Sequence, residues 1–485
     1  MEKKATNHWF ILVILALAQF MVVLDISIVN VMLPTVQKTF HLSQLNLQWI
    51  ITAYTLAFGG FLLLGGRAAD LFGRRKVFLS GVVVFTLASL ADGLSQSGGM
   101  LISLRVVQGL AGAFMSPAAL SIVLVTYREG HARNLALSVW GAVAAGGAAV
   151  GVLLGGIVTQ YLGWRWNFFI NVPIGILVIA FAWKLVPRHE NEEKKSNLDL
   201  PGAVSVTVGL MSLVYALTNA PTKGWTSHSS LLFFGIAIVL LVFFVMNELR
   251  AKHPLMPMSI FKIRNVAGAN LIQLTVAASL FSVFFFTTLY VQEILGYSPV
   301  KTGVSFLALP IVIAICATNA PHLIKRIGFR PILIVAPLFT ATGLFMLGHV
   351  PVHGHYFHDL LPGFILMSIG LGFSFVSILV AATSGVAGHL SGLASGLVNT
   401  AQQVGGSLGL AILSGIAASS TVRYIAHAGI PTQLTAVAAR VHGFQTGYYA
   451  AVGFALFASL LAIVVLRKPK QPAGGKSETE PVVAL

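Results

Sequence analysis

The sequence predicts an all-α integral membrane protein with fourteen transmembrane helices, and three observations support this fold class. Hydrophobic residues make up 56% of the 485 positions and charged residues only 9%, whereas charged residues make up about 25% of soluble domains. Apolar runs recur along the whole chain, each close to the roughly 20 residues that a helix needs to cross a hydrocarbon core of about 30 Å. Lysines and arginines collect on alternate connections between these runs. A water-soluble fold is therefore excluded.

The apolar runs define the fourteen predicted spans. They are residues 10–32, 48–65, 77–95, 101–126, 135–160, 167–186, 201–219, 230–248, 266–292, 302–321, 331–349, 361–385, 393–420 and 446–466. The first run follows a basic N-terminus, as in a signal peptide, but it lacks a small-residue cleavage site and contains Asp25. We therefore predict that it is retained as the first helix.

The basic residues indicate how the chain is oriented in the membrane. With both termini in the cytoplasm, 23 of the 30 lysines and arginines lie on the cytoplasmic side, six lie outside, and Arg105 alone lies within a span. This is the asymmetry of the positive-inside rule. The net charge of +16 therefore reflects topology, and we expect no nucleic-acid partner. The single cysteine, Cys316, excludes an intrachain disulfide framework.

A weak internal repeat predicts two similar halves. Gly73-Arg74-Arg75-Lys76 and Gly328-Phe329-Arg330-Pro331 lie 255 residues apart, and each follows one span and precedes the next. Many carriers are built from such repeats. We predict an N-terminal six-helix bundle at 1–186, a cytoplasmic linker at 187–200, two additional transmembrane helices at 201–250, a C-terminal six-helix bundle at 251–466 and a disordered cytoplasmic tail at 467–485.

The turn between the second and third spans combines glycines, a carboxylate and cations. Its residues of interest are Gly66, Asp70, Gly73, Arg74 and Arg75. Glycine permits a tight turn, and Asp70 is expected where the next helix begins, close to the positive helix end. We predict a conformational latch that breaks and reforms as helices rock. A basic loop that only sets topology would explain the cations but neither Asp70 nor the glycine spacing.

At this turn the sequence resembles the major facilitator superfamily, whose loop signature is G-x-L-x-D-R-x-G-R-[RK]; Ala68 and Leu71 depart from it. Further matches narrow the resemblance to the fourteen-span drug:proton antiporters, the group of the EmrB and QacA exporters. These matches run from Leu24 to Pro34, from Arg105 to Gly109, from Trp164 to Pro173 and from Asn399 to Gly406. The resemblance implies a major facilitator fold with two extra central helices, and drug export in exchange for protons.

Glycines in the fifth span bear on the direction of transport. Gly147, Gly151 and Gly155 are spaced by four and lie on one face, and Gly156 follows them. Small residues let helices approach closely, and ordinary tight packing is one explanation. In the resembled family they match the exporter signature G-x-x-x-G-P-x-x-G-G, with Val152 in place of the proline. The resemblance thus supports export without settling it.

Asp25 and Arg105 are the two ionisable residues that we place clearly inside spans. A charge at the bilayer centre costs about 2.5–3.5 kcal/mol on insertion scales, so such residues are functional candidates. We predict that Asp25 takes up the proton or a cationic substrate group, and that Arg105 orients it. The alternatives are an Asp25 that reaches outer water and an Arg105 that snorkels to the outer surface.

Amides and aromatic rings are the candidates for substrate contact. The residues are Asn30, Gln108, Gln273, Phe284, Tyr290, Asn399 and Gln403. Such a mixture suits lipophilic solutes, although polar packing between helices explains the amides equally well. Glu293, at the outer end of the ninth span, is expected to be an exposed rim charge rather than a second coupling site.

Other classes of protein find little support. Gly475-Lys476-Ser477 is only a fragment of a phosphate-binding loop, and no H-E-x-x-H pattern occurs, so neither an ATP-driven pump nor an enzyme is expected. Repeated halves favour a carrier over a channel. Four histidines between His349 and His358 fit no metal-ligand spacing, and we expect neither a metal nor a cofactor.

These observations predict a secondary transporter of the cell membrane. We expect it to work as a monomer, with protons and a small molecule as its partners, and to export lipophilic neutral or singly cationic drugs. A proton-coupled importer or exporter of one specific small metabolite is the alternative.

Overall fold

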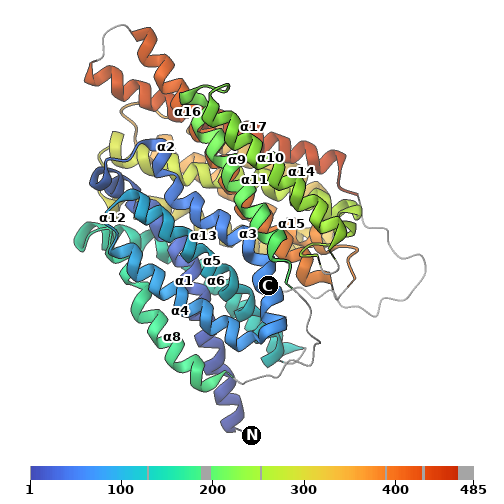
Figure 1. Cartoon of the computed structure of the whole chain (residues 1–485). Coiled ribbons are helices and arrows are strands. Elements are labelled where there is room, and N and C mark those ends of the chain that lie inside the picture. The colour runs from blue at the N-terminus through green and yellow to red at the C-terminus, as the bar shows by residue number, and fades with distance from the viewer. Residues whose placement is uncertain are drawn as a thin grey trace.

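The computed structural model describes residues 2–127, 130–186, 198–251, 254–387, 390–428 and 432–467 (Figure 1). Over these residues the chain is helical, with no strand. Fourteen helices are long and apolar enough to cross a membrane, which confirms the predicted number. Most of the linker at 187–200 and nearly all of the tail at 467–485 lie outside the described residues.

The helices follow one another with short connections. They are α1 (Glu2–Phe40), α2 (Gln44–Leu47), α3 (Trp49–Phe72), α4 (Arg74–Gly93), α5 (Gly98–Thr126), α6 (His131–Tyr161), α7 (Trp166–Phe169), α8 (Asn171–Leu185), α9 (Leu200–Lys223), α10 (His228–Arg250), α11 (Arg264–Leu289), α12 (Pro299–Phe306), α13 (Ala308–Ile327), α14 (Phe329–Leu347), α15 (Leu361–Thr383), α16 (Ser391–Ala428) and α17 (Gln433–Val464). Short 3-10 or π turns, η1 (Met258–Lys262), η2 (Tyr290–Ile294) and η3 (Tyr356–Leu360), precede or extend α11 and α15.

Several helices are longer than the predicted spans, among them α1, α16 and α17. α1 continues through Pro34 to Phe40, although its span was predicted to end at 32. α16 has 38 residues, and α17 begins at Gln433 rather than at 446. Hydropathy identifies only the apolar part of a helix, whereas α16 and α17 pack against each other and protrude as a pair beyond the other helices (Figure 1).

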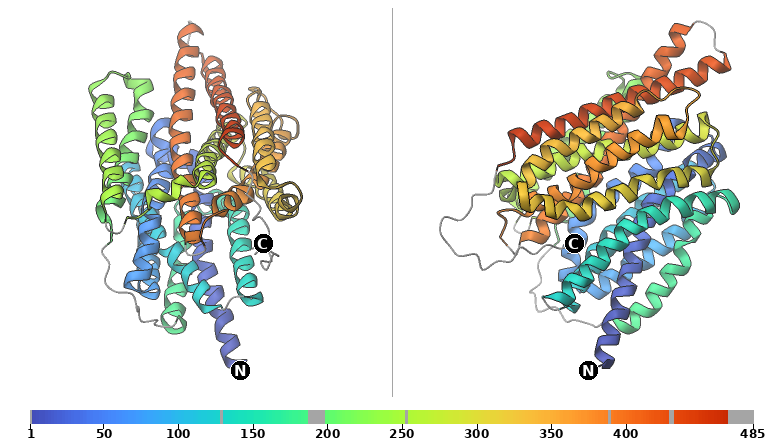
Figure 2. Two further views of the ribbon diagram at one scale, coloured as in Figure 1. Left: turned by 90° about the vertical axis from the view of Figure 1, so that its right-hand side faces the viewer. Right: turned by 180° about the vertical axis from the view of Figure 1, so that it is seen from behind.

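The transmembrane helices form two groups that lie side by side (Figure 2). In the first group, α3 and α4 pack on α5, and α1 packs on α6 and α8. In the second group, α14 packs on α15 and α17, and α11 packs on α16. Each group thus packs helices that are consecutive in the chain, such as α4 and α5, together with helices that are not, such as α1 and α6.

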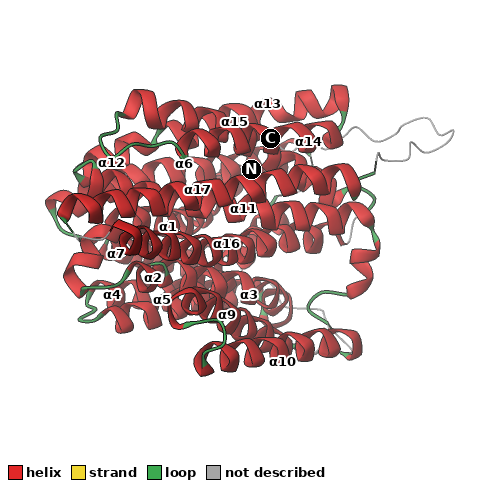
Figure 3. Ribbon diagram, turned by 90° about the horizontal axis from the view of Figure 1, so that it is seen from above, coloured by secondary structure: helices red, strands yellow, loops and turns green. Residues whose placement is uncertain are grey.

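The additional helices α9 and α10 pack on each other, and α9 lies against α3 and α16, one helix from each group (Figure 3). The Gln48 amide donates to the Thr218 hydroxyl at 2.9 Å across this contact. At the other end of the pair, Asn247 donates to both oxygens of Asp199, and Glu248 accepts from the Met256 backbone. The pair therefore covers one flank of the junction between the groups.

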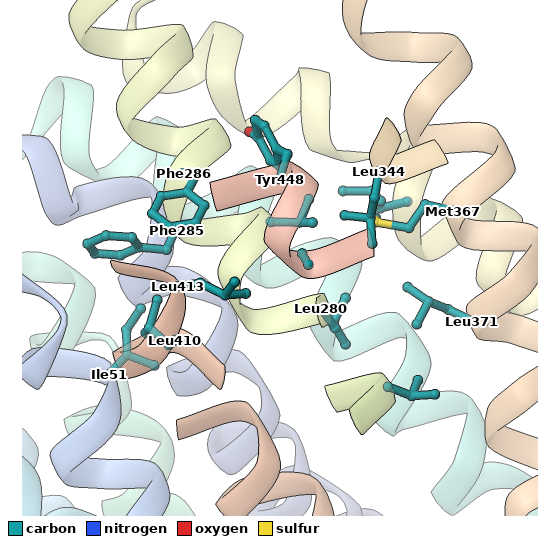
Figure 4. Packing of buried hydrophobic residues seen from close by; sticks show 14 of the residues in the cluster. Ile51, Leu280, Phe285, Phe286, Leu344, Met367, Leu371, Leu410, Leu413 and Tyr448 are labelled. Carbon is teal, nitrogen blue, oxygen red and sulfur yellow. The ribbon is translucent and has the colours of Figure 1, made fainter. Parts of the chain in front are cut away.

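Apolar packing joins the two groups at one end of the molecule. The largest hydrophobic cluster includes Ile51 of α3, Phe285 and Phe286 of α11 and Leu410 of α16 (Figure 4). Beside it the Gln292 amide of η2 donates to the Val31 carbonyl of α1 at 2.8 Å. This end of the contact between the groups is therefore closed. It is the outer end in the predicted topology.

Candidate functional site: a buried ion-pair network

Asp25 and Arg105, 80 residues apart in the chain, form an ion pair between α1 and α5. The Arg105 guanidinium donates through Nη1 to Asp25 Oδ2. Asp25 is 0% exposed and Arg105 is 1% exposed. Both alternative readings are therefore wrong, because Asp25 does not reach outer water and Arg105 does not snorkel to a surface.

Arg105 has further partners besides Asp25. Nε donates to the Ile50 carbonyl at 3.0 Å, and Nη1 donates to Gln108 Oε1. The guanidinium carbon lies 4.2 Å from the centre of the Tyr54 ring and 5.8 Å from that of Phe168. A desolvated cation over an aromatic face gains about 2 kcal/mol or more. Protein side chains and one backbone carbonyl thus hold Arg105 in place.

The second oxygen of Asp25 accepts from two amides. Gln108 Nε2 donates to Asp25 Oδ1 at 2.9 Å, and Asn171 Nδ2 donates at 3.3 Å. Both amides also donate to the Ser89 hydroxyl oxygen, at 2.6 and 3.3 Å. The network therefore links α1, α3, α4, α5 and α8. Arg105 and Gln108 reach the same carboxylate because residues three apart share one face of a helix.

The Asp25 carboxyl thus faces one cation and two amide donors, with Arg105 as its charge partner. Removing one partner of a buried ion pair typically costs 3–5 kcal/mol, because the other charge is left uncompensated. The site therefore holds α1 and α5 together through one buried ion pair.

A third buried ionisable group, Asp92, was missed by the sequence analysis. It lies within the predicted span 77–95 and is 0% exposed, and among the described residues neither of its carboxyl oxygens has a hydrogen-bond partner. The statement that only Asp25 and Arg105 lie clearly inside spans is thus wrong. Glu248 is also within a span and buried. Glu293 pairs with the exposed Arg440 at 3.1 Å.

The predicted latch residues lie at the turn between α3 and α4. Asp70 is in the last turn of α3 rather than at the start of α4, because the helix runs on to Phe72 before Gly73, with φ 97°, reverses the chain. Asp70 pairs with Arg74 at 3.2 Å. Arg75 donates to the Trp183 carbonyl of α8, and a side chain at Gly66 would meet only Pro117.

The glycines of the fifth span lie in α6 and face its neighbours closely. A Cβ at Gly151 would lie 2.6 Å from the Ser27 Cβ of α1, and Gly147 and Gly155 approach α1 in the same way. A Cβ at Gly156 would lie 2.5 Å from the Pro299 carbonyl oxygen of the second group. The buried Val152 stands in the cluster that joins the groups.

Of the predicted substrate contacts, Gln108 is bonded directly to the ion pair, and the others lie elsewhere. Two of them donate to backbone carbonyls, Asn30 to that of Ile26 and Tyr290 to that of Pro351. Two pack on neighbours, Gln403 on Gly59 and Phe284 on Phe306. Gln273 is buried, with both polar atoms unpartnered among the described residues, and Asn399 is exposed. The structure also adds Asn171 and Ser89 to the network, which the sequence analysis did not assign.

One enzyme-like pattern in the chain is excluded by its position. Gly405 to Gly409 reads G-x-S-x-G, the pattern of a hydrolase nucleophile on a strand-to-helix turn. Here Ser407 lies in the middle of α16, donates to the Gln403 carbonyl at 2.8 Å and lies 2.6 Å from the Thr55 hydroxyl. It is therefore a helix-packing residue rather than a nucleophile.

The sequence profile of the Major Facilitator Superfamily matches residues 15–410. The chain belongs to the major facilitator superfamily. It is therefore a membrane transporter for small molecules rather than an enzyme, and a multi-pass protein of the cell membrane.

Curated relatives within the major facilitator superfamily are named for drug resistance and export. The puromycin resistance protein pur8 of Streptomyces alboniger is 40% identical over 95% of this chain and 92% of its own length. The cephamycin export protein CmcT of Amycolatopsis lactamdurans is 36% identical over 97% of this chain and 94% of its own length.

Solved structures of the superfamily share the fold. The POT family transporter PepTSo superimposes with a TM-score of 0.69 at 15% identity, covering 95% of this chain and 97% of that one. A bacterial homologue of the human lysosomal transporter Spinster, inward-facing and unoccupied, gives a TM-score of 0.68 at 15% identity, covering 95% and 97%. At these identities the likeness concerns the fold alone.

Proposed function

We propose that this protein exports lipophilic drugs or antibiotics in exchange for protons, by alternating access, and that Asp25 is the proton site. The single observation that carries this proposal is the fully buried Asp25–Arg105 pair. A transporter that needed only to bind an apolar solute would have no use for an ion pair in a span, where each charge is expensive.

Proton uptake at Asp25 would change what holds α1 to its neighbours. In the ionised state Asp25 accepts from Arg105, Gln108 and Asn171. A proton on the carboxyl removes the charge that these donors stabilise, so α1 can separate from α5 and α8. A ligand or proton shifts a two-state equilibrium only by its difference in affinity for the two states, and this loss of attraction supplies such a difference.

Alternating access requires that the closed end opens. There the groups are joined by the bond from Gln292 to Val31, by the Val300 backbone donating to Gln160 at 3.2 Å, and by the close approach of Gly156 to Pro299. At the other end of α6, a Cβ at Gly141 or Gly146 would meet no atom within 4 Å. We propose that the two groups rock about this contact as two six-helix bundles, with Asp70 and Arg74 as the latch.

The substrate class follows from charge and from the relatives. Asp25, Asp92 and Arg105 together carry at most one net negative charge, which suits a neutral or singly cationic solute. The names of the relatives refer to puromycin, an amine-bearing antibiotic, and to cephamycin export. We propose that this chain handles lipophilic antibiotics of comparable size and acts as a monomer.

Flux in proteoliposomes with an imposed pH gradient tests the proposal. The probes are puromycin, a cephamycin and the cationic dye ethidium, each followed by its accumulation against its own gradient. We expect at least one probe to accumulate when protons flow the opposite way. Asp25→Asn should abolish accumulation but keep the protein folded, since the amide can accept from Arg105.

Glu293→Gln is the matched control, because it removes an acid at the edge of a span that pairs with an exposed arginine. It should transport at the wild-type rate. If no probe moves in response to the pH gradient in the wild type, the importer or single-metabolite alternative is favoured. If Asp25→Asn keeps wild-type accumulation, Asp25 is not the proton site.

A further inference from the structure

We propose that Asp92 is a second proton-carrying residue, and that Asp25 and Asp92 share one proton and the single cation Arg105. This inference rests on the proposed function and deepens it. It begins with the contrast between the two carboxyls. Asp25 accepts hydrogen bonds from three side chains, whereas Asp92, equally buried, accepts none at either oxygen.

An ionised carboxylate without donors is unstable in such a place. Burial of an unpaired charge costs far more than burial of a neutral group, and the group takes up a proton instead. Asp92 is also the next-to-last residue of α4, where the carbonyl end of the helix carries partial negative charge and disfavours a second one. The neutral, protonated carboxyl is therefore the form that fits this position.

Asp92 is close to the network described above. Ser89 lies three residues earlier on α4, hence on the same face and about 4.5 Å along the axis. The Ser89 hydroxyl accepts from Gln108 and Asn171, the two amides that also donate to Asp25. One turn of helix thus separates Asp92 from the donors that it lacks.

The helices α3, α5, α7 and α8 pack on α4 and bring few other charges towards Asp92. The helix α5 carries Arg105, and α3 carries Tyr54, whose ring lies under the Arg105 guanidinium. Asp25 of α1 is linked to α4 through Gln108, which donates to both Asp25 and Ser89. Arg165, just before α7, donates to the Ser95 carbonyl at 3.1 Å. In α8 the charged residue is Lys184, at the opposite end from Asn171. Arg165 is held by the Ser95 carbonyl and lies over the Trp164 ring, 4.5 Å from its centre, which leaves Arg105 as the cation that the two carboxyls share.

The charge balance defines two states of equal net charge. With the proton on Asp92, Arg105 pairs with Asp25, which is the arrangement in this structure. When the proton passes to Asp25, Arg105 turns to the ionised Asp92. In both states one proton, two carboxyls and one guanidinium sum to zero. Asp92 lies at the end of α4 that leads to the connection with α5, so it would take the proton from that side.

The test compares wild-type protein, Asp92→Asn, Asp25→Asn and the control Glu293→Gln in proteoliposomes with ethidium and puromycin. Two quantities are measured, accumulation driven by a pH gradient and exchange of labelled for unlabelled probe at equal pH. We expect Asp92→Asn to keep exchange at equal pH and to lose both gradient-driven accumulation and the pH dependence of the exchange rate. A merely structural role would lower all rates without altering the pH profile.

The outcomes separate the two proposals. If the wild type does not respond to the gradient, the proposed function fails and the role of Asp92 falls with it. If the wild type responds, Asp25→Asn does not, and Asp92→Asn keeps the wild-type pH profile, only the role of Asp92 is overturned.

A second measurement covers the case in which Asp92→Asn does not fold. Infrared difference spectra of the purified protein across a pH titration report the C=O stretch of a protonated carboxylic acid. We expect such a band in the wild type and its shift in Asp92→Glu. A band that is unchanged in Asp92→Glu, or absent in the wild type, contradicts the proposal.

Discussion

The turn at Gly73 and the turn at Gly328 share their geometry and differ in their charge. Each glycine ends one helix and begins the next at a positive φ, 97° and 79°. Two residues later an arginine donates to a carbonyl near the end of another helix: Arg75 to Trp183 of α8, and Arg330 to Ile463 of α17. The weak repeat in the sequence therefore corresponds to a repeated helix–turn–helix connection with a glycine at positive φ.

The charges at the two turns do not repeat. In the first turn Asp70 pairs with Arg74. The corresponding positions in the second turn hold Lys325 and Phe329, and Phe329 is buried in the hydrophobic cluster. One turn is closed by a partly exposed ion pair that salt and protons can weaken, whereas the other is anchored by an apolar side chain that they cannot.

The same contrast holds inside the two groups. In each group the first and fifth membrane-spanning helices, α1 and α6 or α11 and α16, approach closely at a glycine. Gly151 of α6 lies against Ser27 of α1, and Gly409 of α16 lies against Ala278 of α11. However, α1 and α5 meet through an ion pair, while Leu280 of α11 and Leu371 of α15 belong to an apolar cluster (Figure 4). Both groups thus use close glycine contacts, and among the described residues the buried Asp25–Arg105 pair belongs to the first group.

The largest expected effect is the loss of the cation at the buried pair. Arg105→Met should lower the free energy of unfolding by about 3–5 kcal/mol, because it leaves Asp25 as a lone buried charge. Thermal unfolding of the purified protein in detergent measures it. The double variant Asp25→Asn with Arg105→Met should regain most of the loss.

The control for this prediction is Arg330→Met in the second group, which removes one hydrogen bond to a carbonyl and should cost about 1 kcal/mol. Equal losses in Arg105→Met and Arg330→Met would contradict the contrast between the two groups.

The glycine contacts should be the next most sensitive positions. A Cβ at Gly151 or at Gly409 would lie 2.6 or 2.3 Å from the neighbouring helix, so alanine at either position should cost about 1–3 kcal/mol through overpacking. Gly141→Ala, which meets no atom within 4 Å, should cost nothing. If alanine lowered the free energy of unfolding at Gly151 but not at Gly409, the two groups would not share the same glycine contact.

The turn glycines should have a smaller and equal effect. Gly73→Ala and Gly328→Ala meet no atom, but each forces a positive φ on alanine, which should cost about 1 kcal/mol. The control is Gly235→Ala in α10, where nothing lies within 4 Å and φ is ordinary. Unfolding temperatures that fall at only one of the two turns would break the parallel between them.

The smallest effect on stability is expected at the charges of the turns. Asp70→Asn removes a partly exposed ion pair, which should change the free energy of unfolding by less than about 1 kcal/mol. Its effect should appear in the rate of gradient-driven transport and in the response of that rate to added salt. Lys325→Gln, at the corresponding position, should leave both unchanged. A salt response that survives in Asp70→Asn would argue against the latch.

The fold was predictable from the sequence because an apolar run long enough to span a bilayer has few alternatives to a helix. The ends of the helices were less predictable. The first part of α17, before residue 446, is too polar for a span, and it is helical because it packs on α16. Hydropathy contains no information about that contact.

The site was predictable only in its charges. Asp25 and Arg105 stand out because they interrupt apolar runs, but the sequence could not show that they meet. Ser89 and Tyr54 carry no signal, since single hydroxyls are common in spans. Asp92 lies near the end of its run, where a carboxylate usually reaches water, and only the burial of that end by α5, α7 and α8 reveals it.

The ion pair also has a consequence for how the protein is made. Asp25 is synthesised 80 residues before Arg105, which corresponds to roughly 4–16 seconds at about 5–20 residues per second. During that time the first helix carries an acid without its partner, at an insertion cost of about 2.5–3.5 kcal/mol if it is ionised. The buried acid of the first helix therefore lacks its partner until the fourth membrane-spanning helix has been synthesised.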